Sequence, residues 1–169
     1  MGQLFRAMCI KGAALALLTS TAGALAADVN LTVSGIQGNE GRIRVAVYSD
    51  QEHFLDETYA LTLREKVARE GSVTLPIQGL PAGQYAIFAY HDSNKNRSFD
   101  RRLWLIPAEG YGLSNNPAVG EELSFTNGVV EIGEDRASDL SIELNYCEDK
   151  DAVDASVGRV LGCWISQAD

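Results

Sequence analysis

Short runs of alternating apolar and polar residues, separated by glycine-containing turns, constrain the fold of this chain more than any other feature. Between residues 42 and 48 every second residue is apolar and β-branched, namely Ile43, Val45 and Val47. The same period recurs in four other segments: 29–36, 60–68, 73–77 and 140–144. A period of two places neighbouring side chains on opposite faces, so each run predicts a β-strand. Since no segment has a long helical period, the sequence predicts an all-β fold.

The turns between these runs predict how the strands connect. The most apolar run, 85–90, is expected at the centre of a sheet. The segment 38–41 is expected to form the hairpin turn between the first two strands. Asn127-Gly128 separates the runs 123–126 and 129–132 and predicts a second hairpin, since this dipeptide favours positive φ at both turn positions. Seven or eight short strands with such turns predict an antiparallel β-sandwich.

The N-terminal 26 residues have the pattern of a secretory signal peptide. Arg6 and Lys11 precede an apolar stretch at 12–18, and Ala24-Leu25-Ala26 supplies small residues for cleavage. The apolar stretch is too short to span ~30 Å of hydrocarbon, which argues against a membrane anchor. We therefore expect three parts: a signal peptide (1–26), a β-sandwich domain (27–144) and a C-terminal appendage (145–169). The expected location is the bacterial periplasm or the exterior.

The charge of the chain limits its partners. The net charge is −9 at pH 7, and removal of Arg6 and Lys11 with the signal peptide makes it more negative. An acidic surface opposes binding to nucleic acid and to anionic lipid. We expect neither nucleic-acid binding nor membrane insertion after the signal peptide is removed.

Two cysteines follow the predicted sandwich domain, Cys147 and Cys163. An even number of cysteines in an exported domain favours a disulfide, which would stabilise a loop of this length by ~3 kcal/mol. Two free buried thiols are the alternative. The spacing does not fit a redox motif or a zinc site.

The segment 92–100 is the part of the sequence that most suggests chemistry. Oxygen-bearing side chains stand at positions one, three, five and nine of a loop, as Asp92, Asn94, Asn96 and Asp100, and Ser98 offers a carbonyl at position seven. This spacing is typical of the first half of a calcium-binding loop. It predicts a weak calcium site with a dissociation constant of about 10⁻⁴–10⁻³ M. No other cofactor is expected.

The same segment departs from a calcium loop in three ways. Arg97 stands where such a loop needs glycine, and Leu103 stands where it has a bidentate glutamate. Lys95, Arg101 and Arg102 add further positive charge. The alternative hypothesis is that the Asp and Asn side chains cap their own turns by hydrogen bonds to the backbone.

The connection continues through residues 106–117, which contain glycines, an aromatic residue and two amides. Glu109 is a candidate to complete a metal site or a turn. Tyr111, Asn115 and Asn116 are candidates for contacts in a sugar or peptide groove. An ordered Ω-loop without a ligand is the alternative.

Several of these motifs together resemble a bacterial family called domain of unknown function 2141. The motifs are 41–48, Gly79-Leu80-Pro81-Ala82-Gly83-Gln84-Tyr85-Ala86, His91-Asp92 with Asn94 and Asn96, Pro107 to Gly112, and Ser114-Asn115-Asn116. The resemblance covers about residues 28–144. It implies an exported β-sandwich of transthyretin-like or immunoglobulin-like type. The family has no established activity, so the resemblance implies no substrate.

Catalytic motifs are scarce in this sequence. The two histidines are His53 and His91, and neither lies in a metalloprotease or nucleophile-elbow pattern. We expect a non-enzymatic binding or structural domain of the cell envelope, with an unknown ligand or envelope protein as partner. The alternative is a periplasmic hydrolase that uses His91, Asp92 and Glu109.

Overall fold

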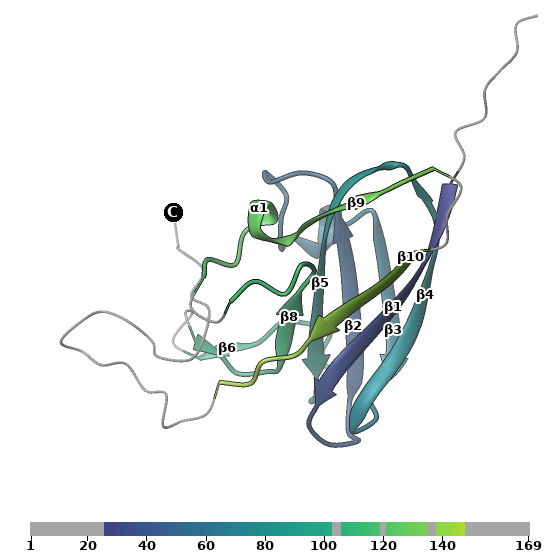
Figure 1. Cartoon of the computed structure of the whole chain (residues 1–169). Helices are drawn as coiled ribbons and strands as arrows, with labels where there is room; N and C mark the ends of the chain where they lie inside the picture. The colour runs from purple at the N-terminus through teal and green to yellow at the C-terminus, as the bar shows by residue number, and fades with distance from the viewer. Residues whose placement is uncertain (1–25, 103–105, 119–120, 135–137, 148–169) are drawn as a thin grey trace, which may run out of the picture.

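The computed structural model describes residues 26–102, 106–118, 121–134 and 138–147 (Figure 1). The predicted signal peptide up to residue 25, Leu103, Cys163 and the rest of the appendage from residue 148 lie outside the described residues. The described chain is mostly β-structure, as the alternating pattern predicted. No helix in these ranges is long and apolar enough to cross a bilayer.

Ten strands and two short helices follow one another along the described chain. In order they are β1 (Ala26–Ile36), β2 (Arg42–Tyr48), the 3-10 helix η1 (Glu57–Tyr59), β3 (Thr62–Val67), β4 (Gly71–Pro81), β5 (Gly83–Asp92), β6 (Arg101–Arg102), β7 (Ile106–Pro107), β8 (Tyr111–Leu113), α1 (Phe125–Gly128), β9 (Val129–Ile132) and β10 (Ser138–Glu143). The count exceeds the predicted seven or eight because β6, β7 and β8 are too short to show a period.

The strands form two larger sheets and one small one. The first sheet has the order β10-β1-β4. The second has the order β3-β2-β5-β8, and β9 also pairs with β5. The two strands β6 and β7 pair with each other beside the second sheet. Figure 1 shows β1 and β4 running side by side in front of β2 and β3.

One face of each larger sheet contributes to a shared buried core. From the first sheet, Val29, Leu31 and Val33 are completely buried in alternate positions of β1. From the second sheet, Ile43 and Val47 of β2 lie in the same cluster. Burial of each such side chain stabilises the fold by about 1.5–3 kcal/mol, so the alternation in the sequence decides which face turns inward.

The other face of the second sheet carries a second buried cluster. Tyr48 of β2 and Phe88 and Tyr90 of β5 belong to it, and the side chains of Phe54 and Phe99 cover them from two loops. Because β5 is covered on both faces, nearly all of its residues are buried. This confirms that the most apolar run lies centrally, and it explains why that run is not alternating.

Two expectations about pairing are wrong. The strand β10 runs parallel to β1, with Leu31 opposite Leu140, whereas the other strand pairs are antiparallel. The turn at 38–41 does not form a hairpin, since β1 and β2 belong to different sheets. Alternation indicates which face of a strand is buried but carries no information on the direction of its neighbour.

The predicted hairpin across Asn127-Gly128 is also wrong. The segment forms α1, because the hydroxyl of Ser124 accepts a hydrogen bond from the amide of Asn127 at 3.3 Å and caps the helix. The strand β9 then pairs with β5, with Val130 opposite Tyr85. Gly128 is required there for packing, since a Cβ atom would lie 2.6 Å from the side chain of Leu113.

Candidate functional site

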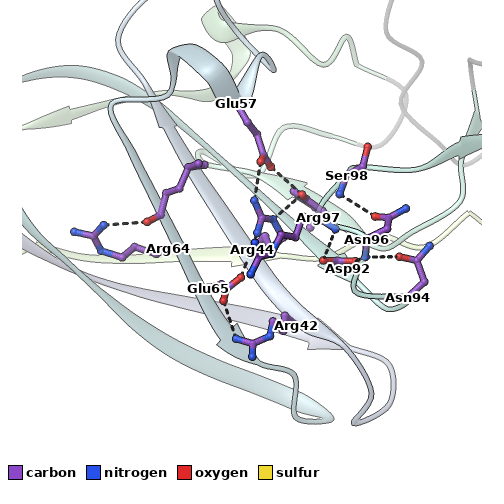
Figure 2. A network of polar contacts seen from close by, with 12 residues as sticks. Arg42, Arg44, Glu57, Arg64, Glu65, Asp92, Asn94, Asn96, Arg97 and Ser98 are labelled. Carbon is purple, nitrogen blue, oxygen red and sulfur yellow. Dashed lines mark hydrogen bonds and ion pairs between the residues drawn. The ribbon is translucent and has the colours of Figure 1, made fainter.

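Asp92 ends strand β5 and organises the loop that follows it. Its side chain is completely buried, and its two carboxylate oxygens accept hydrogen bonds from the amides of Asn96 and Arg97, each at 3.0 Å. The charged acceptor makes these bonds stronger than neutral ones. The chain after β5 is therefore wound around the Asp92 carboxylate (Figure 2).

Asn94 and Asn96 continue the same winding by capping their own turns. The side-chain oxygen of Asn94 accepts from the amide of Asn96 at 2.9 Å, and that of Asn96 accepts from the amide of Ser98 at 2.8 Å. Their amide nitrogens donate to the carboxylate of Asp100 at 2.7–3.0 Å. These contacts are the ones that the turn-capping hypothesis predicts. Calcium binding by Asp92, Asn94, Asn96, Ser98 and Asp100 stays a prediction.

Arg97 adopts the conformation for which a calcium loop uses glycine. Its φ is 63°, and Lys95 has the same value. A residue with a side chain is disfavoured in this left-handed region by about 1–2 kcal/mol. The loop keeps Arg97 there because its amide must point inward to Asp92. The side chain consequently points outward, toward the surface of the second sheet (Figure 2).

Glu109 closes the loop from the segment between β7 and β8. Its two carboxylate oxygens accept from the amides of Ser93 at 3.1 Å and Asp100 at 3.2 Å. Burial raises the pKa of Glu109 to about 7. The nearby negative charges of Asp100 and Asp92 also raise this pKa, whereas the two amide donors lower it. These two contacts are those expected of the turn-completing role, and a role of Glu109 in a metal site stays a prediction.

The structure separates His91 from Asp92. Successive residues of a strand point to opposite faces, so His91 lies on the face of β5 away from the loop. Its Nε2 atom lies 2.7 Å from the carbonyl oxygen of Glu40, and its Nδ1 atom lies 2.8 Å from the hydroxyl of Tyr146. That hydroxyl also accepts from the amide of Gln37 at 3.1 Å. Because a carbonyl oxygen can only accept, the Nε2 atom of His91 is the donor to Glu40.

Ser114, which belongs to the motif at 114–116, also bonds to the backbone. Its hydroxyl accepts from the amide of Ile87 at 2.8 Å and donates to the carbonyl of Gly128. The residue is 1% exposed. His91, Asp92 and Ser114 therefore each form hydrogen bonds with a different segment of the chain.

The remaining loop candidates also have structural partners. Tyr111 is completely buried in the second cluster, so its ring is not exposed as a groove would require. The amide nitrogen of Asn115 donates to the carbonyl of Asn127 at 3.2 Å. Asn116 donates to the carbonyl of Ser141 and accepts from the amide of Glu143, both at 2.8 Å. These asparagines tie the end of β8 to α1 and β10.

The predicted appendage begins inside the domain. Asn145 forms a bridge with Tyr111, and Tyr146 contacts His91 as described above. A Cβ atom on Gly110 would collide with the ring of Tyr146, so close packing requires glycine at this position. Cys163, the predicted disulfide partner of Cys147, lies outside the described residues, so the disulfide between them stays a prediction.

A polar network that the sequence did not reveal crosses the outer face of the second sheet. Arg44 of β2 binds Glu57 at 2.7 Å and Glu65 at 3.2 Å, and its Nε atom donates to the hydroxyl of Tyr90 at 2.8 Å. That hydroxyl in turn donates to Glu57 at 2.8 Å. Figure 2 shows Arg44 between the two glutamates, with Arg97 beside it. The sequence signal for this network was Arg44, a charged residue in β2. The structure shows that buried residues surround it on the outer face of the sheet.

A cavity of about 530 Å³ lies next to this network. Two segments form its walls: the connection from β2 to β3, which contains η1, and the loop that follows β5. Its lining residues are Tyr48, Leu55, Asp56, Glu57, Phe88, Tyr90, Arg97, Ser98, Phe99 and Arg101. This volume is in the range of small-molecule binding sites.

Tyr48 is the polar residue of the cavity wall that lacks a partner. It is 1% exposed, and its hydroxyl has no hydrogen-bond partner among the described residues. Burial raises the pKa of Tyr48, and the negative charges of Glu57 and Asp56 raise it further. A buried hydroxyl without a partner is unusual in a folded protein and calls for an explanation.

The fold and the cavity together define a mostly β domain in which loops cover one face of a sheet. The chain belongs to the bacterial family described as "Uncharacterized protein conserved in bacteria (DUF2141)", which matches residues 31–139. This confirms the resemblance. No curated protein and no solved structure matches the chain.

Proposed function

We propose that this chain is an exported, non-enzymatic binding domain of the bacterial cell envelope. The signal-peptide pattern of residues 1–26 supports export to the periplasm or the exterior. The shared core of the two larger sheets supports a β-sandwich of transthyretin-like or immunoglobulin-like type. The backbone contacts of His91, Asp92 and Glu109 favour a binding role over the hydrolase alternative.

The cavity over the second sheet is the observation that carries this proposal. Its floor is aromatic, from Phe88 and Tyr90, and its rim has charged residues of both signs. Binding sites for small molecules commonly combine a largely apolar lining with a few polar groups that fix the orientation. In this proposal the loop 92–100 is a scaffold that builds one wall of the site.

Protein-observed NMR can test this function. The mature protein is mixed with a small-molecule extract of the periplasm from the producing bacterium. We expect chemical-shift changes at Tyr48, Phe88 and Phe99. Ser98→Trp places a large side chain at the cavity and is expected to abolish the changes. Ser93→Trp is the matched control, because Ser93 is exposed in the same loop and does not line the cavity.

Two outcomes would contradict the proposal. The first is the absence of any shift in the wild-type protein. The second is an equal response in wild type and Ser98→Trp, which would place binding elsewhere. Mass determination of the purified protein tests export separately, since cleavage after Ala26 predicts an N-terminal Ala27.

A further inference from the structure

The cavity contains two arginines that lack a carboxylate partner. Arg97 and Arg101 both line it, and neither guanidinium makes an ion pair or a hydrogen bond within the described ranges. Arg101 instead lies over the ring of Phe99, 5.3 Å from its centroid. Arg44 next to them differs, because two glutamates already bind it.

The carboxylates of the same cavity already have partners. Glu57 accepts from the Arg44 guanidinium with one oxygen and from the Tyr90 hydroxyl with the other. Asp56 caps η1 by accepting from the amide of Thr58 at 2.9 Å. Arg97 and Arg101 are therefore the charged residues of the lining whose side chains have neither an ion pair nor a hydrogen bond among the described residues, in a chain whose net charge is −9. A guanidinium group binds planar anionic oxygen groups well.

The hydroxyl of Tyr48 also has no hydrogen-bond partner among the described residues. Because Tyr48 is 1% exposed, this hydroxyl lies below the surface of the cavity. Between Tyr48 and the arginines lies an aromatic surface. The ring of Phe99 is 5.1 Å from that of Phe88 and 5.6 Å from that of Tyr90. A flat, unsaturated molecule can pack on such rings through offset or edge contacts.

We propose that the cavity binds a small aromatic carboxylate. Its carboxylate pairs with Arg97 and Arg101, and its ring packs on Phe99 beside Phe88. This inference rests on the proposed binding function and specifies the class of its ligand. The Arg97 side chain reaches the cavity because the loop holds its backbone in the left-handed conformation.

Three planar probes of nearly equal size test the charge of the ligand. They are benzoate, benzamide and benzamidine, which are anionic, neutral and cationic at pH 7. Titrations of the mature protein are followed by NMR at Tyr48, Phe88 and Phe99. For ligands of this size we expect a benzoate dissociation constant on the order of 1 mM. Benzamide is expected to bind roughly 10-fold more weakly, and benzamidine not at all.

Matched variants locate the binding groups. Arg97→Gln and Arg101→Gln are each expected to weaken benzoate binding about 10-fold and to leave benzamide binding unchanged. Arg69→Gln is the control, because it changes the net charge equally and Arg69 is exposed and outside the cavity lining.

The outcomes separate the ligand class from the general function. If benzamide or benzamidine binds the cavity as well as benzoate does, the anionic ligand is refuted and a binding function stands. An equal loss of benzoate affinity in Arg69→Gln would also refute it, since the effect would then be one of net charge. If periplasmic compounds bind the cavity and none of the three probes does, the aromatic carboxylate is refuted as the ligand class and the binding function stands.

Discussion

Tyr48 and Tyr90 allow one chemical change to be compared at two neighbouring sites. Both rings are buried in the cluster on the outer face of the second sheet. The hydroxyl of Tyr48 has no partner among the described residues, whereas that of Tyr90 bonds to Arg44 and Glu57, each at 2.8 Å. Replacement of either tyrosine by phenylalanine removes one oxygen atom and leaves the ring in place.

The two replacements should have opposite effects on the ligand-free protein. An unsatisfied buried hydroxyl costs about 1–3 kcal/mol, so we expect Tyr48→Phe to raise the free energy of unfolding by about 1 kcal/mol. Tyr90→Phe removes two bonds to charged partners, but the contact of Arg44 with Glu57 at 2.7 Å remains. We expect it to lower the free energy of unfolding by about 2 kcal/mol.

Urea denaturation followed by circular dichroism measures both changes, on protein refolded from denaturant so that no ligand is carried over. Thermal unfolding should show a rise of about 4 °C for Tyr48→Phe and a fall of about 8 °C for Tyr90→Phe. Destabilisation by Tyr48→Phe of the size expected for Tyr90→Phe would refute the reasoning. It would mean that a buried water or another group satisfies the Tyr48 hydroxyl.

Three further predictions concern the loop 92–100 and its surroundings. The pKa of Glu109 is raised to about 7 in the fold, above its ordinary value of 4.5, so its contribution to stability is present at low pH and is lost as the pH rises through 7. Between pH 5 and pH 8 we expect the free energy of unfolding to fall by about 2 kcal/mol in urea titrations, and Glu109→Gln to flatten this slope while Glu131→Gln keeps it. Arg97→Gly removes a side chain from a φ of 63° and should stabilise the protein by about 0.5–1 kcal/mol in the same assay. Asn96→Gly removes the contacts to Ser98 and Asp100 and should destabilise it, so a loss of stability in both variants would contradict the strain argument. Calorimetric titration with calcium should give a dissociation constant no tighter than about 10⁻⁴ M, because the loop has no bidentate glutamate at position twelve, and a value below about 10⁻⁶ M would mean that the loop rearranges into a complete calcium site.

The sequence predicted the faces of the strands better than their neighbours. Alternation located β1, β2 and β4, because each buries one face in the core. The continuous apolar run correctly placed β5 at the centre. The parallel pairing of β10 with β1 depends on where the chain crosses between sheets, and no local pattern encodes that crossing. The helix α1 depends on one cap by Ser124, which outweighed the turn preference of Asn127-Gly128.

The candidate site likewise has one part that could be predicted from the sequence and one part that could not. The loop 92–100 could be recognised because its signal is local: oxygen side chains at alternate positions bond to amides two to five residues away. The cavity could not be recognised, because it unites residues of β2, η1 and β5 with the loop. Tyr48 in particular looked like one alternating residue of a strand, and its missing partner is a property of the folded protein alone.

The backbone of the loop 92–100 connects the hydrogen bonds around Asp92 to the cavity. The amides of Asn96, Arg97 and Ser98 point inward to the side-chain oxygens of Asp92 and Asn96. With the amides directed inward, the side chains of Arg97, Ser98 and Phe99 line the cavity on the other side. A spacing of oxygens that resembles a calcium loop is therefore consistent with a different task here, that of holding an arginine and an aromatic ring at the edge of a binding site. On this reasoning Asp92→Asn, which leaves one inward amide without an acceptor, should weaken benzoate binding even though Asp92 itself is completely buried and does not line the cavity.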